Sequence, residues 1–459
     1  MTVDSKYYMH NSDRVALQAL KSIPGFTQLL KAFMKVWNEK QFRIQNMSSN
    51  LRINEKQMSK YYEMLPPMCE KLGIEIPELY LTLDVNANAY TYGDTKPFIV
   101  ITSGLIETLP EELIPTVLAH ECGHIACHHC LYTTMGSIIL NGTSSLLSLW
   151  GITDLVTIPL QVAFYYWMRC SEYSADRAAA LYDGSPDKIV DMCMRFAGFD
   201  KDIGEGANKE SFMEQALEYK ALIDDSKWNK TLEFIMLSNT DHPLNAVRAY
   251  ECNEWAKEER FTKMVNYLNI PQSDNSTSIS EFLKEVPMTE SSKTYVGENY
   301  LDVIEKFKEY GFTNIKTVKI TDKGLLTKNG QTLNILIDNK DGFAMGDWYA
   351  IDAEICIEYY EPETEEEVAA AHPGQLRIPN SSKYYLGKNY QEVANELKEK
   401  GFSQIELENQ LKDKKAWLTK DGAVSRISIN GQTQFDKGEW FDEKSIIHIV
   451  YQTFSSENN

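Results

Sequence analysis

The segment His120-Glu121-Cys122-Gly123-His124 contains the residue types of a hydrolytic metal site. On a helix, His120 and His124 project from one face because they are four residues apart, so both imidazoles can bind one ion. A zinc ion with three protein ligands keeps a position for water and lowers the pKa of that water to about 7. Glu121 can then take the proton as the water attacks a peptide carbonyl. The segment therefore predicts a peptidase with Zn2+ as its cofactor.

A third ligand is expected downstream, in the segment 171–180. Glu172 and Asp176 lie on one helical face there: Glu172 can bind the metal, and Asp176 can orient a ligand histidine through its other ring nitrogen. Alone, this pair would be interpreted as a solvated acidic face, but the upstream motif favours the metal site. A metzincin arrangement would need Gly at 127 and His at 130, whereas the chain has Cys127 and Cys130. That subclass is excluded.

The segment Cys127-His128-His129-Cys130 is the alternative metal site considered from the sequence. It lacks a partner cluster at the spacing of structural zinc sites, so its cysteines are interpreted as small buried hydrophobic residues. Cys122 is expected to pack between the ligand helix and the core, and oxidation sensitivity is the alternative. The 8 cysteines are scattered along the chain, which is typical of reduced thiols in a cytosol.

Hydrophobic spacing indicates the elements that position these residues. Residues 1–268 form a mainly helical unit, with apolar residues at helical spacing in 13–30 and 111–130. Residues 79–83 and 98–102 are short β-rich runs bounded by Pro, Asp and Gly, which predicts strands. The expected fold class is a mainly α zincin-like metallopeptidase domain with a small β-sheet, followed by two small α+β repeat modules.

The repeat modules are predicted from an internal duplication. Residues 291–300 return ninety positions later as 381–390, and later matching segments are offset by ninety-two, so two residues are inserted in the second copy. Each copy contains an amphipathic helix that is predicted to end at Gly311 or Gly401, followed by strand-like alternation.

Composition shifts give the domain boundaries. One linker is rich in Ser, Asp and Thr, and the other is acidic. The predicted parts are a metallopeptidase domain over 1–268, a linker over 269–292, the first repeat over 293–361, an acidic linker over 362–381 and the second repeat over 382–455.

Charge and hydropathy limit the partners. The net charge of −20 argues against nucleic acid, because a phosphate backbone would repel such a surface. The polar start of the sequence shows no secretory signal. Residues 131–153 carry no charge and are long enough to span a bilayer, but they contain several polar residues, and Asp154 and Pro159 interrupt the apolar stretch after them. A soluble, cytoplasmic protein is favoured, and a membrane-associated hairpin over 131–168 is the alternative.

Several segments together resemble the zinc metallopeptidases that include the HtpX-like heat-shock proteases and the CaaX prenyl proteases, peptidase family forty-eight. The resemblance covers about residues 10–255 and rests on five segments in this order: 88–90, 102–106, 118–124, 172–179 and 242–248. The chain lacks clear N-terminal membrane spans and is therefore more similar to the soluble bacterial branch of this family.

The resemblance implies a gluzincin site with three zinc ligands: His120, His124 and Glu172. It implies Glu121 as the general base and Asp176 as a residue that orients a ligand. His242 is then a donor to the developing oxyanion, and Arg248 contacts the Glu172 region or the substrate. A further segment resembles the edge strand that pairs with an extended polypeptide substrate by β-augmentation: Asn88, Ala89 and Tyr90.

The duplicated modules resemble PASTA-type domains, which have a helix, a small sheet and a glycine followed by aromatic residues. This resemblance implies that the repeats bind a ligand or a protein partner, or regulate the peptidase, with a spacer or dimerisation unit as the alternative. For the whole chain, the alternative to a zinc endopeptidase is a binding or chaperone-like protein in which the zinc is structural.

Overall fold

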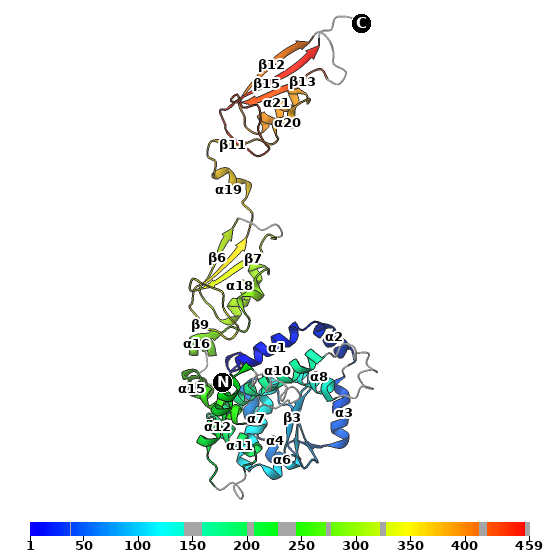
Figure 1. The fold of residues 1–459 in the computed structure, drawn as a ribbon, viewed down its shortest axis with the longest axis vertical. Helices are drawn as coiled ribbons and strands as arrows, with labels where there is room; N and C mark the ends of the chain where they lie inside the picture. Colours follow the sequence, from blue (N-terminus) through cyan, green and yellow to red (C-terminus); the bar gives the residue numbers. More distant parts are fainter. Residues whose placement is uncertain are drawn as a thin grey trace. The chain divides into compact units, whose positions relative to one another are not determined.

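The computed structural model describes residues 1–36, 38–141, 158–199, 206–227, 245–271, 277–321, 327–412 and 420–454. The chain divides into two compact units (Figure 1). Unit 1 contains residues 1–318 and 330–359, and unit 2 contains residues 319–329 and 360–459.

The described residues of unit 1 up to residue 268 form mainly helices. Its helices in chain order are η1 (Ser5–Tyr7), α1 (Asn11–Ser22), α2 (Phe26–Val36), α3 (Glu39–Ser49), α4 (Ser59–Tyr62), α5 (Leu65–Leu72), α6 (Ser103–Thr108), η2 (Glu111–Leu113), α7 (Ile114–Ala126), α8 (Cys130–Asn141), α10 (Ile158–Asp183), α11 (Asp187–Phe196), α12 (Lys209–Asp224), α14 (Asn245–Ala256) and α15 (Glu259–Leu268).

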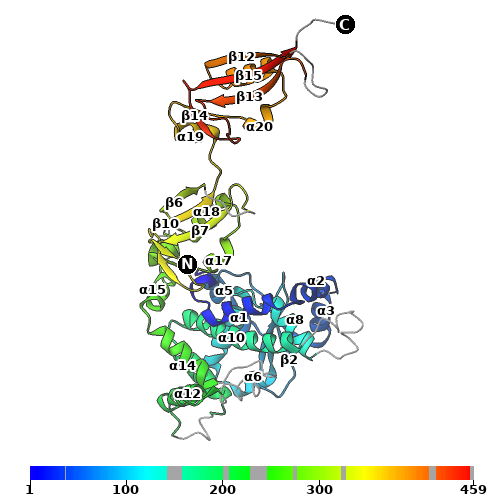
Figure 2. The same cartoon turned by 45° about the horizontal axis from the view of Figure 1, so that its top comes forward.

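Local sequence explains where the important helices begin. His10 starts α1 by accepting a hydrogen bond from the backbone N–H of Ser12, and Asp13 lies in the first turn. Pro115 lies in the first turn of α7, where its missing N–H removes no helical hydrogen bond. Helix α1 lies along α10 in both views (Figures 1 and 2).

A mixed four-stranded sheet completes this part. Strands β1 (Leu51–Ile53), β2 (Glu78–Thr82), β3 (Ala89–Tyr92) and β4 (Phe98–Thr102) lie in the order β1-β2-β4-β3. β2 and β4 are parallel, whereas β1 and β3 run antiparallel to their neighbours. The strands predicted at 79–83 and 98–102 are β2 and β4. β4 is buried along its whole length, and β3 forms an edge of this sheet.

The first repeat shares its hydrophobic core with these helices. Its elements are α16 (Ile279–Leu283), β5 (Glu285–Pro287), α17 (Ser292–Tyr295), α18 (Tyr300–Tyr310), β6 (Ile315–Ile320), β7 (Thr332–Ile337), β8 (Lys340–Asp341), β9 (Trp348–Ala350) and β10 (Ile355–Tyr360). Buried Val286 and Phe307 belong to the same cluster as Leu118 of α7. The compact units therefore divide the chain differently from the predicted boundaries, and residues 269–292, predicted as a linker, contain α16 and β5.

Polar contacts also join the first repeat to the helices. Arg260 of α15 donates to Glu285 over 2.8 Å, and its guanidinium lies 4.5 Å from the centre of the Trp348 ring. Arg14 of α1 donates to the carbonyl oxygen of Met288 over 3.4 Å. These contacts explain why a segment with the composition of a linker is ordered against the helices.

Unit 2 contains the second repeat. Its elements are α19 (Glu365–Ala370), β11 (Gln375–Arg377), α20 (Ser382–Tyr385), α21 (Tyr390–Glu399), β12 (Gln404–Lys412), β13 (Ala423–Ile429), β14 (Trp440–Asp442) and β15 (Ile446–Phe454). The sheet order is β12-β15-β13 (Figure 2).

The two copies share structural details. Gly311 ends α18 in the left-handed conformation, as predicted, and Gly401 lies one residue beyond the C-cap of α21 with φ +99°. A stacked tyrosine pair recurs in each copy, with ring centres 3.9 Å apart for Tyr300 and Tyr359 and 3.8 Å apart for Tyr390 and Tyr451. Their relation to PASTA-type domains stays a prediction.

The length and hydropathy of the helices bear on the membrane alternative. Among the described residues, no helix is both long enough and apolar enough to cross a bilayer. The uncharged stretch predicted as a possible hairpin, 131–168, includes residues 142–157, which lie outside the described part of the chain.

Candidate metal centre

Helices α7 and α10 bring two histidines and a glutamate together. The Nε2 atom of His120 lies 3.5 Å from one carboxylate oxygen of Glu172, and the Nε2 atom of His124 lies 3.3 Å from the other. One ligand atom from each residue lies within 4.8 Å of the others, and all three residues are buried. Two imidazole nitrogens and a carboxylate are the donor set of catalytic zinc sites, so these residues fit a zinc ion.

The second metal cluster considered from the sequence does not form in the described part of the chain. Cys127 and Cys130 are buried free thiols, and neither belongs to a group of metal-ligand side chains there. Burial raises the pKa of the Cys130 thiol to about 12, because a thiolate is poorly solvated in the core. These cysteines pack as small hydrophobic residues.

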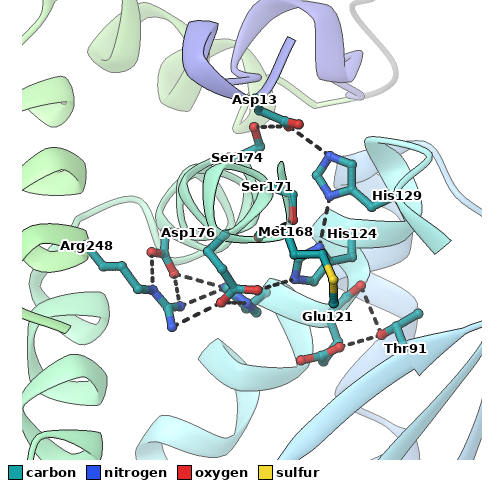
Figure 3. A network of polar contacts seen from close by, with 12 residues as sticks. Asp13, Thr91, Glu121, His124, His129, Met168, Ser171, Ser174, Asp176 and Arg248 are labelled. Carbon is teal, nitrogen blue, oxygen red and sulfur yellow. Dashed lines mark hydrogen bonds and ion pairs between the residues drawn. The ribbon is translucent and has the colours of Figure 1, made fainter. Parts of the chain in front are cut away.

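Two further residues contact the ligand side chains: Asp176, which lies on α10, and Arg248, which lies on α14 (Figure 3). Asp176 Oδ1 lies 2.9 Å from His120 Nδ1, and the Arg248 guanidinium makes two hydrogen bonds of 2.8 and 2.6 Å to the same carboxylate. Arg248 also lies 3.1 Å from Glu172. Because this arginine contacts both carboxylates, it offsets the cost of burying two negative charges side by side.

The charges in this cluster shift its pKa values. Burial alone would raise the pKa of Asp176, but the nearby charge of Arg248 and the hydrogen bonds from Arg248 and His120 outweigh burial and lower it. Burial would likewise lower the pKa of His120, yet hydrogen bonds to Asp176 and Glu172 raise it to about 9. Without a metal, the His120 ring is therefore protonated and lies between the two carboxylates. A bound ion would replace the proton on Nε2.

A hydrogen bond from the four-stranded sheet holds the Glu121 side chain in place. The hydroxyl of Thr91, in the middle of β3, donates to the Glu121 carboxylate and also lies 3.5 Å from the Glu121 carbonyl oxygen (Figure 3). Both side chains are buried. Thr91 was not identified from the sequence, where a threonine in a short strand gives no signal beyond β-propensity.

A cavity of about 380 Å³ opens beside this cluster. β3 and the residues before it form part of its wall, and Glu121, His120 and His124 line it as well. The predicted substrate segment lies in that wall: Asn88, Ala89 and Tyr90. Among the described residues, β3 pairs with β4 alone, so it is an edge strand of the sheet.

The structure thus brings together most of the site residues predicted from the sequence. His120, Glu121 and His124 come from α7, and Glu172 and Asp176 come from α10. Arg248 joins them from α14. His242, predicted as the oxyanion donor, lies outside the described residues, and its role stays a prediction.

Gly123 allows the two ligand helices to approach. A Cβ atom at this position would lie 2.7 Å from Ala178 Cβ and 3.0 Å from Ala175 Cα, so α7 would have to move away from α10. We expect Gly123→Ala to cost about 1–3 kcal/mol of unfolding free energy through overpacking and to weaken zinc binding by displacing His120 and His124 from Glu172. Denaturant unfolding of the metal-free chain and zinc titration measure the two effects.

Gly136→Ala in α8 is the matched control. It gains the same helix propensity of about 1 kcal/mol, but its Cβ would meet only side-chain atoms, at 3.0 Å from Phe164 and 3.4 Å from Met168. Gly136→Ala is expected to be the more stable variant and to bind zinc normally. Equal stability of the two variants contradicts a packing role for Gly123.

Comparisons with known proteins add to this geometry. Residues 63–256 match the model of peptidase family M48. The plastoglobule-localized metallopeptidase 48 of Arabidopsis thaliana, a chloroplastic protein, is 30% identical over 270 residues, which are 58% of this chain and 77% of that protein. A protease HtpX homolog of Ralstonia pickettii is 24% identical over 169 residues, 32% of this chain and 59% of the relative.

One solved structure has only a weak similarity to this chain. The three-PASTA-domain of a Ser/Thr kinase from Staphylococcus aureus is 14% identical and covers 37% of this chain and 65% of its own, with a TM-score of 0.15. A score this low carries no weight for the fold of the repeats.

Proposed function

We propose that this chain, which belongs to peptidase family M48 and is a metallopeptidase, is a zinc-dependent endopeptidase. The observation that carries this proposal is the convergence of His120 Nε2, His124 Nε2 and the Glu172 carboxylate on one point, beside the carboxylate of Glu121. When bound there, zinc would lower the pKa of a water molecule and polarise the scissile carbonyl.

Glu121 supplies the proton transfers in this proposal. It follows the ligand His120 on α7, and the Thr91 hydroxyl restrains one of its carboxylate oxygens, so the other is available to accept the proton of the attacking water. The same carboxyl group can then return the proton to the leaving amine. Asp176 accepts the Nδ1 proton of His120, which keeps Nε2 free as a ligand.

The substrate is proposed to be an extended polypeptide. β3 lines the same cavity as the catalytic cluster, and it is an edge strand of its sheet in the described part of the chain, so its backbone can hydrogen-bond an extended chain. Asn88, Ala89 and Tyr90 would contact that chain, and His242 would donate to the oxyanion. The repeats are proposed to bind a ligand or partner, or to regulate access.

A structural zinc site is the rival function. It requires a fourth protein ligand in place of water. Within the described residues, the cluster contains three candidate ligands and opens into the cavity, which favours a catalytic site.

The test uses the purified full-length chain and a reduced, alkylated, unfolded protein as substrate. We expect one zinc ion per chain, loss of cleavage when a chelator removes the metal, and recovery when zinc is restored. Undiminished cleavage by the metal-free chain would exclude the mechanism, and stoichiometric zinc without any cleavage would favour the structural site.

A further inference from the structure

A second buried carboxylate lies behind the metal centre, on the side of His124. His124 Nδ1 lies 2.9 Å from His129 Nδ1, and His129 Nε2 lies 2.9 Å from Asp13 Oδ2 (Figure 3). His129 and Asp13 are almost completely buried. Asp13 comes from α1 and His129 from the turn between α7 and α8, so three separate segments meet at this line of contacts.

The backbone of that turn directs His129 back toward His124. His128 has φ +57°, a left-handed conformation that is uncommon for a residue with a side chain. After this residue, the backbone N–H of His129 donates to the carbonyl oxygen of His124 over 2.9 Å. The chain therefore adopts a less favourable backbone conformation at the point that brings the two imidazoles together.

When His124 binds a metal through Nε2, the hydrogen-bond donors and acceptors of this line match in only one way. A histidine that binds a metal through Nε2 carries its proton on Nδ1, so His124 is the donor. His129 Nδ1 must then accept, which places the proton of the neutral His129 ring on Nε2. That N–H faces Asp13, and an ionised carboxylate only accepts. The line therefore runs from His124 through His129 to Asp13.

Asp13 is built to remain an acceptor. Besides His129, it accepts hydrogen bonds from Trp167 Nε1 over 3.0 Å and from Ser174 Oγ over 2.6 Å. Burial would raise its pKa, but the hydrogen bonds from His129, Ser174 and Trp167 counteract burial, and the pKa is lowered. Both donors lie on α10, the helix that carries Glu172.

We propose that His129 and Asp13 are positioning residues that fix the orientation and tautomer of His124 for metal binding. Each ligand histidine then has its own carboxylate: Asp176 contacts His120 directly, and Asp13 reaches His124 through His129. Partners of this kind hold the ligand ring and raise its basicity. The inference rests on the proposed zinc site.

The test measures zinc binding to the full-length, metal-free chain by competition with a chromophoric chelator. We expect His129→Leu, which removes both polar atoms, to weaken zinc binding by about 10- to 100-fold. His129→Gln offers an acceptor and a donor again and is expected to restore most of the affinity. His448→Leu in β15 of unit 2 is the matched control, because it makes the same chemical change outside the residues of the metal centre, and it should bind zinc like the wild type.

Asp13→Asn tests the other end of the line. An amide at this position can donate to His129 Nε2, which favours the tautomer whose Nδ1–H opposes that of His124, so zinc affinity is again expected to fall by about 10-fold or more. The visible spectrum of bound Co²⁺ should change in His129→Leu and Asp13→Asn but not in His448→Leu.

The outcomes separate this inference from the proposed function. Absence of zinc binding in the wild-type chain would overturn the proposed function and this inference with it. If the wild type binds zinc and folded His129→Leu binds it equally tightly, only the inference fails. Equal losses in folded His129→Leu and His129→Gln also contradict it. Should His129→Leu not fold, unchanged zinc affinity in Asp13→Asn contradicts the inference in its place.

Discussion

Replacing Glu121 by glutamine is expected to lower the turnover of a polypeptide substrate by about 100- to 10,000-fold while the chain still binds one zinc ion. The amide has nearly the shape of the carboxylate and can still accept the hydrogen bond that Thr91 donates. It lacks the basicity needed to take a proton from water at neutral pH. The metal-ligand group contains His120, His124 and Glu172 but not Glu121, so binding should survive.

The measurement pairs turnover with zinc content in the same preparation. Glu107→Gln in α6 provides the control, since it makes the same chemical change at an exposed position away from the cavity, and it should cleave like the wild type. Normal turnover in Glu121→Gln would refute the role of Glu121 as general base. Loss of zinc from that variant would instead make Glu121 part of the metal-binding group.

The metal cluster could be predicted from the sequence because helical geometry alone determines most of it. His120 and His124 share a face of α7 at a spacing of four, and Glu172 and Asp176 share a face of α10 in the same way. Only the packing of α7 on α10 had to be assumed, and the resemblance to a known family supplied it. The small strands β2 and β4 were predicted for a similar reason, since their composition is strongly β-forming.

The supporting residues could not be predicted because their contacts depend on the tertiary fold. Asp13 is separated from His129 by 116 residues, and Thr91 is separated from Glu121 by 30. Asp13 lies in the first turn of α1, where an acidic residue is explained well enough by the helix dipole. His129 was considered only as part of a possible metal cluster with its neighbouring cysteines.

The position of the first repeat shows a second limit. Polar composition predicted a linker over 269–292, yet the sparse apolar residues within it, including Val286 and Met288, are fully buried against the helices. Composition gives the number of apolar residues in a segment, but it does not show whether another part of the chain can pack against them. The first repeat is consequently part of the compact unit that contains the metal centre.

Glu172→Gln is expected to weaken zinc binding by more than about 100-fold and to abolish metal-dependent cleavage. Substitution of a residue that only supports a ligand costs about 10- to 100-fold in affinity. The substitution removes the anionic ligand and leaves two neutral imidazoles, while the side-chain volume is almost unchanged. Arg248 keeps its two hydrogen bonds to Asp176, so the metal-free fold should persist. Zinc competition titration and denaturant unfolding of the metal-free chain measure the two properties separately.

Asp176→Asn is the comparison that distinguishes a ligand from its supporting residue. Asp176 contacts His120 through Nδ1, on the opposite side of the ring from Glu172, so it can influence the metal only through that histidine. Its loss should therefore cost about 10- to 100-fold in zinc affinity, less than the loss of Glu172. If Asp176→Asn weakens binding as much as Glu172→Gln does, in folded protein, Glu172 is not a ligand. Both variants remove one buried negative charge next to Arg248, so the change in buried charge is similar in the two. The order of their zinc affinities therefore tests which of the two carboxylates is the ligand.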